Sequence, residues 1–131
     1  MTTVVISLFI AATLPIALSL ASIPLRIKTF GKIDINNPRT QAAKFEGIGE
    51  RLSHAQSNAW EALALYISAI VAMIATNTDL NLASTAASMF VVARFFHAGF
   101  YIAGLGILRF LSFVVAAAAI IWIYIIAFSA I

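Results

Sequence analysis

Four long apolar blocks, separated by short polar segments, dominate the pattern of this 131-residue sequence. They cover about 1–25, 57–76, 82–104 and 110–131. Each has roughly the 20 residues that a helix needs to cross a hydrocarbon core about 30 Å thick. The runs are continuous rather than alternating, which excludes the strands of a membrane β-barrel. The pattern therefore predicts an all-α fold, a four-helix bundle that is an integral membrane domain over 1–131.

The polar segment before the second block predicts where its helix starts. Asn37 is a residue type suited to an N-cap, and Pro38 suits the first helical position. We therefore expect the second helix to begin near 38, outside the membrane. Gly47 and Gly49 interrupt its otherwise favourable composition and indicate a bend.

Composition narrows the classes of protein and site. The chain is 63% hydrophobic and 10% charged, with a mean hydropathy of +1.02, which excludes a soluble globular or disordered protein. It has no cysteine, so disulfides, thiolate metal sites and a cysteine nucleophile are excluded. His54 and His97 have no third ligand at a recognisable spacing. We therefore predict no metal site.

Charge placement predicts the orientation. Basic residues gather in the 26–56 connection (Arg26, Lys28, Lys32, Arg39, Lys44 and Arg51) and in the 105–109 connection (Arg109), whereas 77–81 has none. Because cytoplasmic loops are rich in Lys and Arg, both basic connections are expected on the cytoplasmic side, and both termini on the other. The first block has no basic residue ahead of it, so we interpret it as a retained span rather than a signal peptide. The net charge of +3 reflects this topology and not nucleic-acid binding.

Two helices carry a polar stripe. On the second helix Arg51, His54, Asn58 and Glu61 fall within an arc of about 80°, and on the third helix Arg94, His97 and Tyr101 within about 60°. A charge inside a bilayer costs about 2.5–3.5 kcal/mol even on lenient scales. Glu61 and Arg94 should therefore turn away from lipid, toward each other, other helices or a wet cavity. The stripe descends from the cytoplasmic face.

These polar residues have two readings from the sequence. Asn58, Glu61 and Arg94 can form hydrogen bonds that fix helix packing, or they can bind a ligand. Tyr101 can donate a proton or hydrogen bond to a reacting group, or belong to the aromatic belt at the membrane surface. The residues alone leave both pairs of alternatives open.

The same residues form a recognisable combination of motifs. The chain contains Asn37-Pro38-Arg39, Glu50-Arg51, the run from His54 to Glu61 (HAQSNAWE), the run from Ala93 to Tyr101 (ARFFHAGFY) and Leu108-Arg109. This combination resembles the MAPEG superfamily, the membrane-associated proteins in eicosanoid and glutathione metabolism. The resemblance covers the whole chain and is closest to short bacterial members, which implies a bacterial plasma membrane.

The resemblance implies a homotrimer with glutathione held between subunits near the cytoplasmic ends of the helices. By the same resemblance, the glutathione-binding positions are Asn58, Glu61, Gln56, His54, Arg51, Arg94 and His97, with Tyr101 as a supporting donor. Arg109 resembles the arginine that stabilises the glutathione thiolate in catalytic members. A fixed cation lowers the pKa of a free thiol, which is near 8.5, so this role is chemically sound.

The implied function is a glutathione-dependent transferase or peroxidase that acts on a lipophilic substrate. The chain departs from the catalytic pattern at His54, where well-studied members carry arginine, because a neutral histidine makes no forked contact with a carboxylate. A non-enzymatic lipid-binding or scaffold protein is the alternative. A small proton-coupled exporter is the third, but Glu61 lies near the inner surface and has fixed companions in Arg94 and His97.

Overall fold

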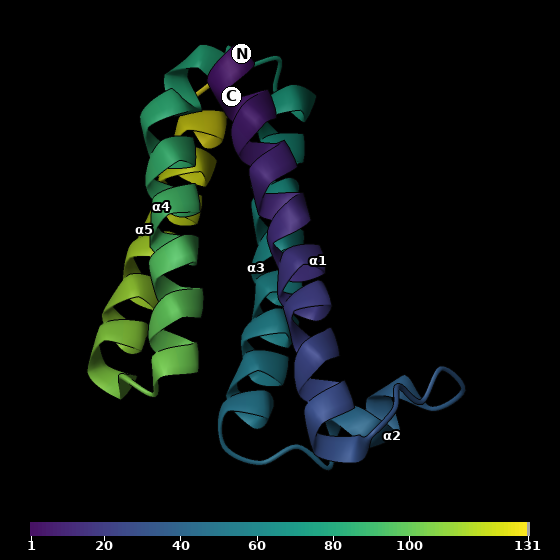
Figure 1. Ribbon diagram of the computed structural model, residues 1–131. Coiled ribbons are helices and arrows are strands. Elements are labelled where there is room, and N and C mark those ends of the chain that lie inside the picture. Colours follow the sequence, from purple (N-terminus) through teal and green to yellow (C-terminus); the bar gives the residue numbers. More distant parts are fainter. Residues whose placement is uncertain (131) are drawn as a thin grey trace.

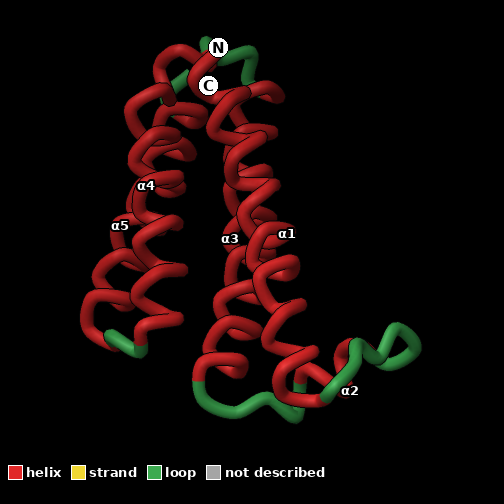
Figure 2. The backbone as a smooth tube through the Cα atoms, in the orientation of Figure 1, coloured by secondary structure: helices red, strands yellow, loops and turns green. Residues whose placement is uncertain are grey.

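The structure is a computed structural model that describes residues 1–130, and nearly all of them are helical (Figure 1). The helices are α1 (Thr2–Phe30), α2 (Pro38–Ala42), α3 (Ile48–Ala75), the 3-10 helix η1 (Leu80–Ala83), α4 (Ser84–Ala103) and α5 (Gly106–Phe128). Short loops join them, and no strand occurs within residues 1–130 (Figure 2). Four helices are long and apolar enough to cross a membrane: α1, α3, α4 with η1, and α5. The predicted all-α, four-span fold is confirmed.

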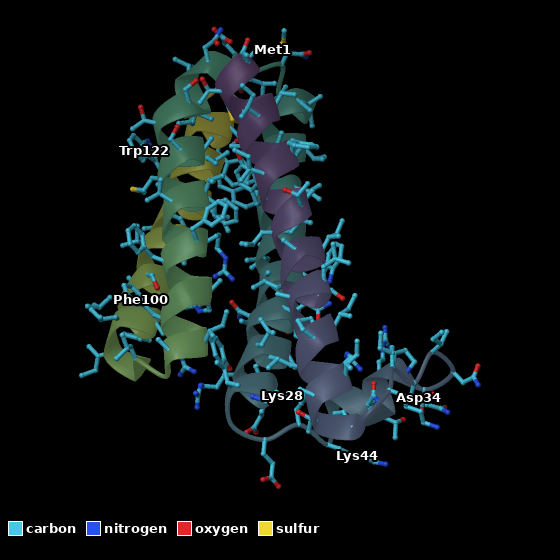
Figure 3. All side chains as sticks on the ribbon, viewed as in Figure 1. Met1, Lys28, Asp34, Lys44, Phe100 and Trp122 are labelled. Atoms are coloured by element: carbon cyan, nitrogen blue, oxygen red, sulfur yellow. The ribbon has the colours of Figure 1, made fainter. Side chains whose placement is uncertain are left out.

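The bundle has two different ends. At one end the N-terminus and the C-terminal part of α5 lie beside the α3–α4 connection (Figure 1), and the Met1 ammonium donates a hydrogen bond to Asn81 Oδ1. We call this the closed end. At the other end lie α2, the α4–α5 connection, and Lys28 and Lys44 (Figure 3). We call this the basic end. The two basic connections thus share one end, as the charge pattern predicted.

Small residues hold the helices together toward the closed end. Five alanines there are fully buried or nearly so: Ala83, Ala86, Ala87, Ala119 and Ala127. Small side chains let helix backbones approach closely, which is how helices associate where lipid removes the hydrophobic drive. The Tyr66 and Phe90 rings stack at 4.3 Å between α3 and α4, and both are buried. The Tyr66 hydroxyl lies 2.5 Å from Ser7 Oγ on α1.

The second helix differs from its prediction. A helix does begin at Pro38, but it ends at Ala42, and the spanning helix α3 starts only at Ile48. Gly47 precedes α3 with φ +62°, a conformation that favours glycine, so the predicted bend is a full break. Gly49 has another role, because a Cβ there would lie 2.4 Å from Cδ1 of Phe45. It lets the chain after α2 pack against the start of α3.

Other helix boundaries also differ from the sequence pattern. Asn37 occupies the N-cap position of α2, but its side chain makes no cap hydrogen bond. Just before the helix, the Asp34 carboxylate accepts the N–H groups of Asn36 and Asn37. The first helix runs on to Phe30. The last begins at Gly106, which places Arg109 inside α5 rather than in the connection before it.

Candidate functional site

The polar stripes of α3 and α4 face each other across the bundle. Arg94 and His97 on α4 are each only 3% exposed, Asn58 on α3 is half-buried, and Glu61 is exposed on the outside of the chain. The expectation that both charges turn away from lipid therefore holds for Arg94, which is covered by its own chain, but within this chain it does not hold for Glu61, which is exposed.

A hydrogen-bonded chain links the two stripes. Arg94 Nη2 donates to Asn58 Oδ1 at 2.8 Å, and Asn58 Nδ2 lies 3.4 Å from Glu61 Oε2. The expected approach of Glu61 to Arg94 is thus mediated by Asn58. These three residues line a cavity of about 110 Å³, which we call the Glu61 cavity. Its other walls are apolar and come from α3, α4 and α5.

The α5 wall of the Glu61 cavity was not identified from the sequence. Phe113, Ala116, Ala117 and Ile120 line it. The apolar run from 110 onward indicates only packing and lipid contact, because every face of it is apolar. The spacing of three and four residues in this set is the one signal that could have pointed to a common helix face.

A second, larger cavity opens at the basic end. It has a volume of about 360 Å³, and we call it the Arg109 cavity. Charged and polar side chains from three helices line it: Glu50, Arg51 and His54 from α3, Tyr101 from α4 and Arg109 from α5. The structure thus brings together Arg51, His54, Tyr101 and Arg109, four of the residues that the sequence selected.

Tyr101 is at the centre of this group. The Arg109 guanidinium carbon lies 4.5 Å from the centroid of the Tyr101 ring, within the range of a cation–π contact. The rings of His54 and His97 meet the Tyr101 ring edge-on, with centroids 6.2 and 5.7 Å away. Arg51 Nε donates to the carbonyl of Ile102 at 2.9 Å, which fixes that side chain across the end of α4.

The tight connection between α4 and α5 explains why Arg109 reaches Tyr101. Gly104 ends α4 with φ +75°, and the N–H of Leu105 returns to the carbonyl of Phe100 at 2.9 Å. The chain then reverses directly into α5. Arg109 therefore lies in the first turn of that helix, where the positive end of the helix dipole disfavours a cation. The helix itself therefore gains nothing from a cation at this position.

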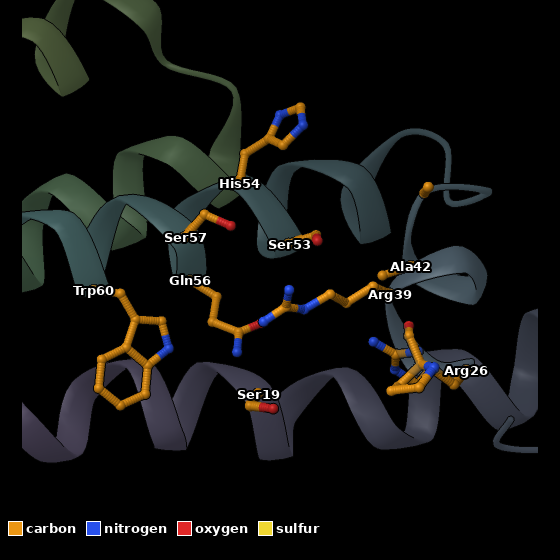
Figure 4. Close-up of a pocket in the computed structure, with 11 residues that line it drawn as sticks. Ser19, Arg26, Arg39, Ala42, Ser53, His54, Gln56, Ser57 and Trp60 are labelled. Carbon is orange, nitrogen blue, oxygen red and sulfur yellow. The ribbon is translucent and has the colours of Figure 1, made fainter. Parts of the chain in front are cut away.

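Gln56 lies outside both cavities. It projects from another side of α3, into a cavity of about 610 Å³ between α1, α2 and α3 that we call the Arg39 cavity (Figure 4). The lining includes Ser19, Arg26, Arg39, Ser53, His54, Gln56, Ser57 and Trp60. The structure therefore does not bring Gln56 together with Arg109 within this chain. His54 borders both cavities.

Two arginines of the Arg39 cavity, Arg26 and Arg39, were not among the site residues predicted from the sequence, where they contributed to the charge pattern and, for Arg39, to the Asn37-Pro38-Arg39 motif. Both belong to a connection with six basic residues, and the sequence does not distinguish which of the six line a cavity. The sequence does not reveal that α2 folds back against α1 and α3. Among residues 1–130, no three His, Asp or Glu side chains gather as a potential metal site.

The fold and the polar cluster define a class: a multi-pass helical membrane protein with polar cavities between its spans. The sequence profile of the MAPEG family matches residues 2–129, and the chain belongs to this family. No curated protein and no solved structure matches the chain.

Proposed function

We propose that the protein is a glutathione-dependent transferase or peroxidase that acts on a lipophilic substrate. The observation that carries this proposal is the position of Arg109. Its guanidinium is held against the Tyr101 ring at the wall of the Arg109 cavity, although helix electrostatics disfavours a cation there. A fixed cation in a cavity lowers the pKa of a thiol bound beside it and so favours the thiolate.

The side chains around the two cavities fit the groups of glutathione. This tripeptide carries one ammonium, two carboxylates and a thiol. Glu61 offers a carboxylate for the ammonium, and Arg51 keeps guanidinium N–H groups beyond the one given to Ile102. Within the described residues, Arg94 Nε and His97 Nδ1 are buried without a hydrogen-bond partner. These two nitrogen atoms are therefore free to form hydrogen bonds with a ligand.

The chemistry follows from the cation. A free thiol has a pKa near 8.5, so only a small fraction is thiolate at neutral pH. Arg109 favours the thiolate, and the nearby N-terminus of α5 adds partial positive charge of the same sign. In conjugation, the thiol loses its proton, sulfur forms a bond to an electrophilic carbon, and the leaving group departs with the electron pair. Tyr101 supports this step in two ways: its ring holds the Arg109 guanidinium in place, and its hydroxyl can donate a hydrogen bond to the reacting group.

The exposure of Glu61 supports assembly as a homotrimer. A carboxylate within a span is costly where it meets lipid, yet Glu61 is exposed on the single chain. A neighbouring copy would cover it and complete the Glu61 cavity. A lipophilic substrate would enter from the bilayer, past the exposed Phe113 on the wall of that cavity.

A non-enzymatic scaffold is the second candidate, and a specific observation favours it. Arg51, Asn58 and Arg94 already have partners within the protein, as expected of groups that only hold helices together. The exporter is less favoured, because Glu61 is linked through Asn58 to a fixed cation.

The test uses the full chain purified in detergent. It measures the binding of glutathione and the rate at which glutathione is conjugated to an activated chloroarene. We expect Arg109→Ala to lower the conjugation rate at pH 7 about 100-fold. If Arg109 acts through the thiol pKa, this deficit narrows as the pH rises past about 8.5, because the thiolate then forms unaided. Lys44→Ala is the control, since it removes a cation outside the cavity. Absence of glutathione binding at millimolar concentration would exclude the enzyme and favour the scaffold.

A further inference from the structure

The loop between α1 and α2, residues 31–37, presents apolar side chains to its surroundings. Ile35 is 85% exposed, the most of any large apolar side chain among residues 1–130, and Ile33 is exposed as well. A single exposed isoleucine is common on protein surfaces, so exposure alone assigns no role. The role of this loop follows from how it is held, which groups it presents and where along the bundle it lies.

Hydrogen bonds from α2 hold the loop. The buried Gln41 side chain donates to the carbonyl of Lys32 at 2.8 Å and accepts the N–H of Asp34 at 3.2 Å. These two bonds lie on either side of Ile33, so the backbone there has little freedom to withdraw the side chain. The loop is therefore a fixed extension of α2 rather than a free segment.

The loop keeps its one negative charge on its own backbone. Asp34 is the only acidic residue among residues 31–37. Its Oδ1 accepts the N–H of Asn36 at 3.1 Å and that of Asn37 at 2.9 Å, the arrangement of an Asx turn. The groups left exposed include two isoleucines and the ammonium of Lys32. Apolar side chains beside a cation are typical of segments that lie at a membrane surface.

The loop lies at the level where the outer surface of the bundle changes from apolar to basic. On α1, exposed apolar side chains continue as far as Ile27, and Lys28 follows. The loop extends sideways past α2 and turns back to the level of the α4–α5 connection (Figures 1 and 2). Ile107, which follows that connection, is 79% exposed. Two separate parts of the chain thus expose isoleucines at one level.

We propose that the 31–37 loop is an interfacial anchor, which lies in the headgroup layer of the bilayer with Ile33 and Ile35 toward the acyl chains. Lys28 and Lys32 have long side chains that can reach lipid phosphates from this level. The binding partner is thus the phospholipid surface itself. Because Gln41 joins the loop to α2, the anchor would also fix the level of that helix relative to the bilayer.

The experiment measures the depth of the loop. The chain has no cysteine, so Ile35→Cys gives one site for a nitroxide spin label. The labelled full chain is reconstituted in bilayers of phosphatidylcholine and phosphatidylglycerol. Power saturation then compares collisions of the label with oxygen, which concentrates among acyl chains, and with a water-soluble nickel chelate.

Two further positions serve as matched references. Leu20→Cys places the label on the exposed face of α1 within the span. Lys44→Cys places it on an exposed residue of the basic end, beyond the spans (Figure 3). We expect the oxygen-to-nickel collision ratio at Ile35→Cys to be at least about threefold higher than at Lys44→Cys, and lower than at Leu20→Cys.

A second variant tests how the loop is held. Gln41→Ala, made in the Ile35→Cys chain, removes both side-chain bonds to the loop. The label should become more mobile, and its collision ratio should fall toward the Lys44→Cys value. Thr40→Ala, an exposed neighbour on α2, is the control and should leave both measurements unchanged.

Two results would overturn the proposal. A collision ratio at Ile35→Cys equal to that at Lys44→Cys would place the loop in water. Protection from both oxygen and nickel would mean that protein covers the loop, and dipolar broadening between labels would identify a second copy of the chain as the cover. If Gln41→Ala moved neither mobility nor depth, the loop would not be fixed through α2. Glutathione is absent from all these measurements, so the anchor and the enzyme can fail separately.

Discussion

The closed end and the basic end of the bundle are built on different principles. At the closed end, buried alanines and the Tyr66–Phe90 stack bring the helices into close contact. At the basic end, the Arg109 and Arg39 cavities lie between helices that carry arginines and histidines. The two ends share the same four spanning helices.

This difference indicates a division of labour along each helix. Close packing needs small residues and good shape complementarity, whereas a ligand site needs space and polar groups left available. A single span meets both needs when its two halves differ. On α4, for example, Ala86, Ala87 and Phe90 are buried in the packed half, and Arg94, His97 and Tyr101 belong to the polar half. Substitutions in the two halves should therefore affect different properties.

Phe90→Ala should have the largest effect on stability. The Phe90 ring is fully buried and stacks on Tyr66 at 4.3 Å, so its removal leaves a cavity at the centre of the packed half. We expect a loss on the order of 3 kcal/mol in the free energy of unfolding, measured by denaturation in detergent. Phe95→Ala is the control, because the Phe95 side chain is exposed on the chain's surface. A variant that unfolds like wild type would contradict the assignment of stability to this half.

Asn58→Ala should affect both stability and binding. Removing the amide leaves the buried Arg94 guanidinium without its acceptor, and hydrogen bonds to charged groups contribute about 1.5–3 kcal/mol. We expect the oligomer to loosen and glutathione affinity to fall. Ser57→Ala, on another side of α3, is the control. If affinity were unchanged while the oligomer loosened, the Arg94–Asn58–Glu61 chain would be a packing device only.

Gly49→Ala tests how the basic end is closed. The new methyl group would meet the Phe45 ring at 2.4 Å, so the chain after α2 must shift. Such overpacking costs about 1–3 kcal/mol. We expect a smaller loss of stability than in Phe90→Ala, because the chain after α2 is short and can shift. Gly99→Ala, which has open space around it, is the control. Loss of stability in both variants would point to helix composition rather than to the Phe45 contact.

The sequence predicted the features that depend on periodicity and charge. Four apolar blocks were enough for four spans, and spacings of three and four put Arg94, His97 and Tyr101 on one side of α4. The placement of basic residues indicated which connections share an end. These properties are local along the chain, so they can be read without knowing how the helices pack.

The features that escaped prediction depend on contacts between distant segments. Gln56 and Asn58 are two residues apart and therefore lie on different sides of α3, but only the structure shows that α1 and α2 enclose the Gln56 side. The bridging place of Asn58 between Arg94 and Glu61 depends on the exact depth of α4 against α3. The assignment of Arg109 to α5 depends on the tight reversal at Gly104.

The smallest expected effect is at the closed end, outside the membrane, and depends on pH. The Asp79 carboxylate accepts the N–H of Asn81 at 2.9 Å, and this bond, aided by the nearby N-terminal ammonium, holds the pKa of Asp79 below its usual value of 3.8. Because the pKa is lower in the folded state, this contribution is present at neutral pH and is lost as the pH falls through the folded pKa. Hydrogen exchange of the Asn81 amide in detergent should therefore become faster on acidification below about pH 4, after correction for the intrinsic exchange rate. Asp79→Asn keeps an acceptor oxygen without the charge, so its corrected exchange should not change over the same range. An equal response in both proteins would mean that acid opens this end by another route, for example through the contact between Met1 and Asn81.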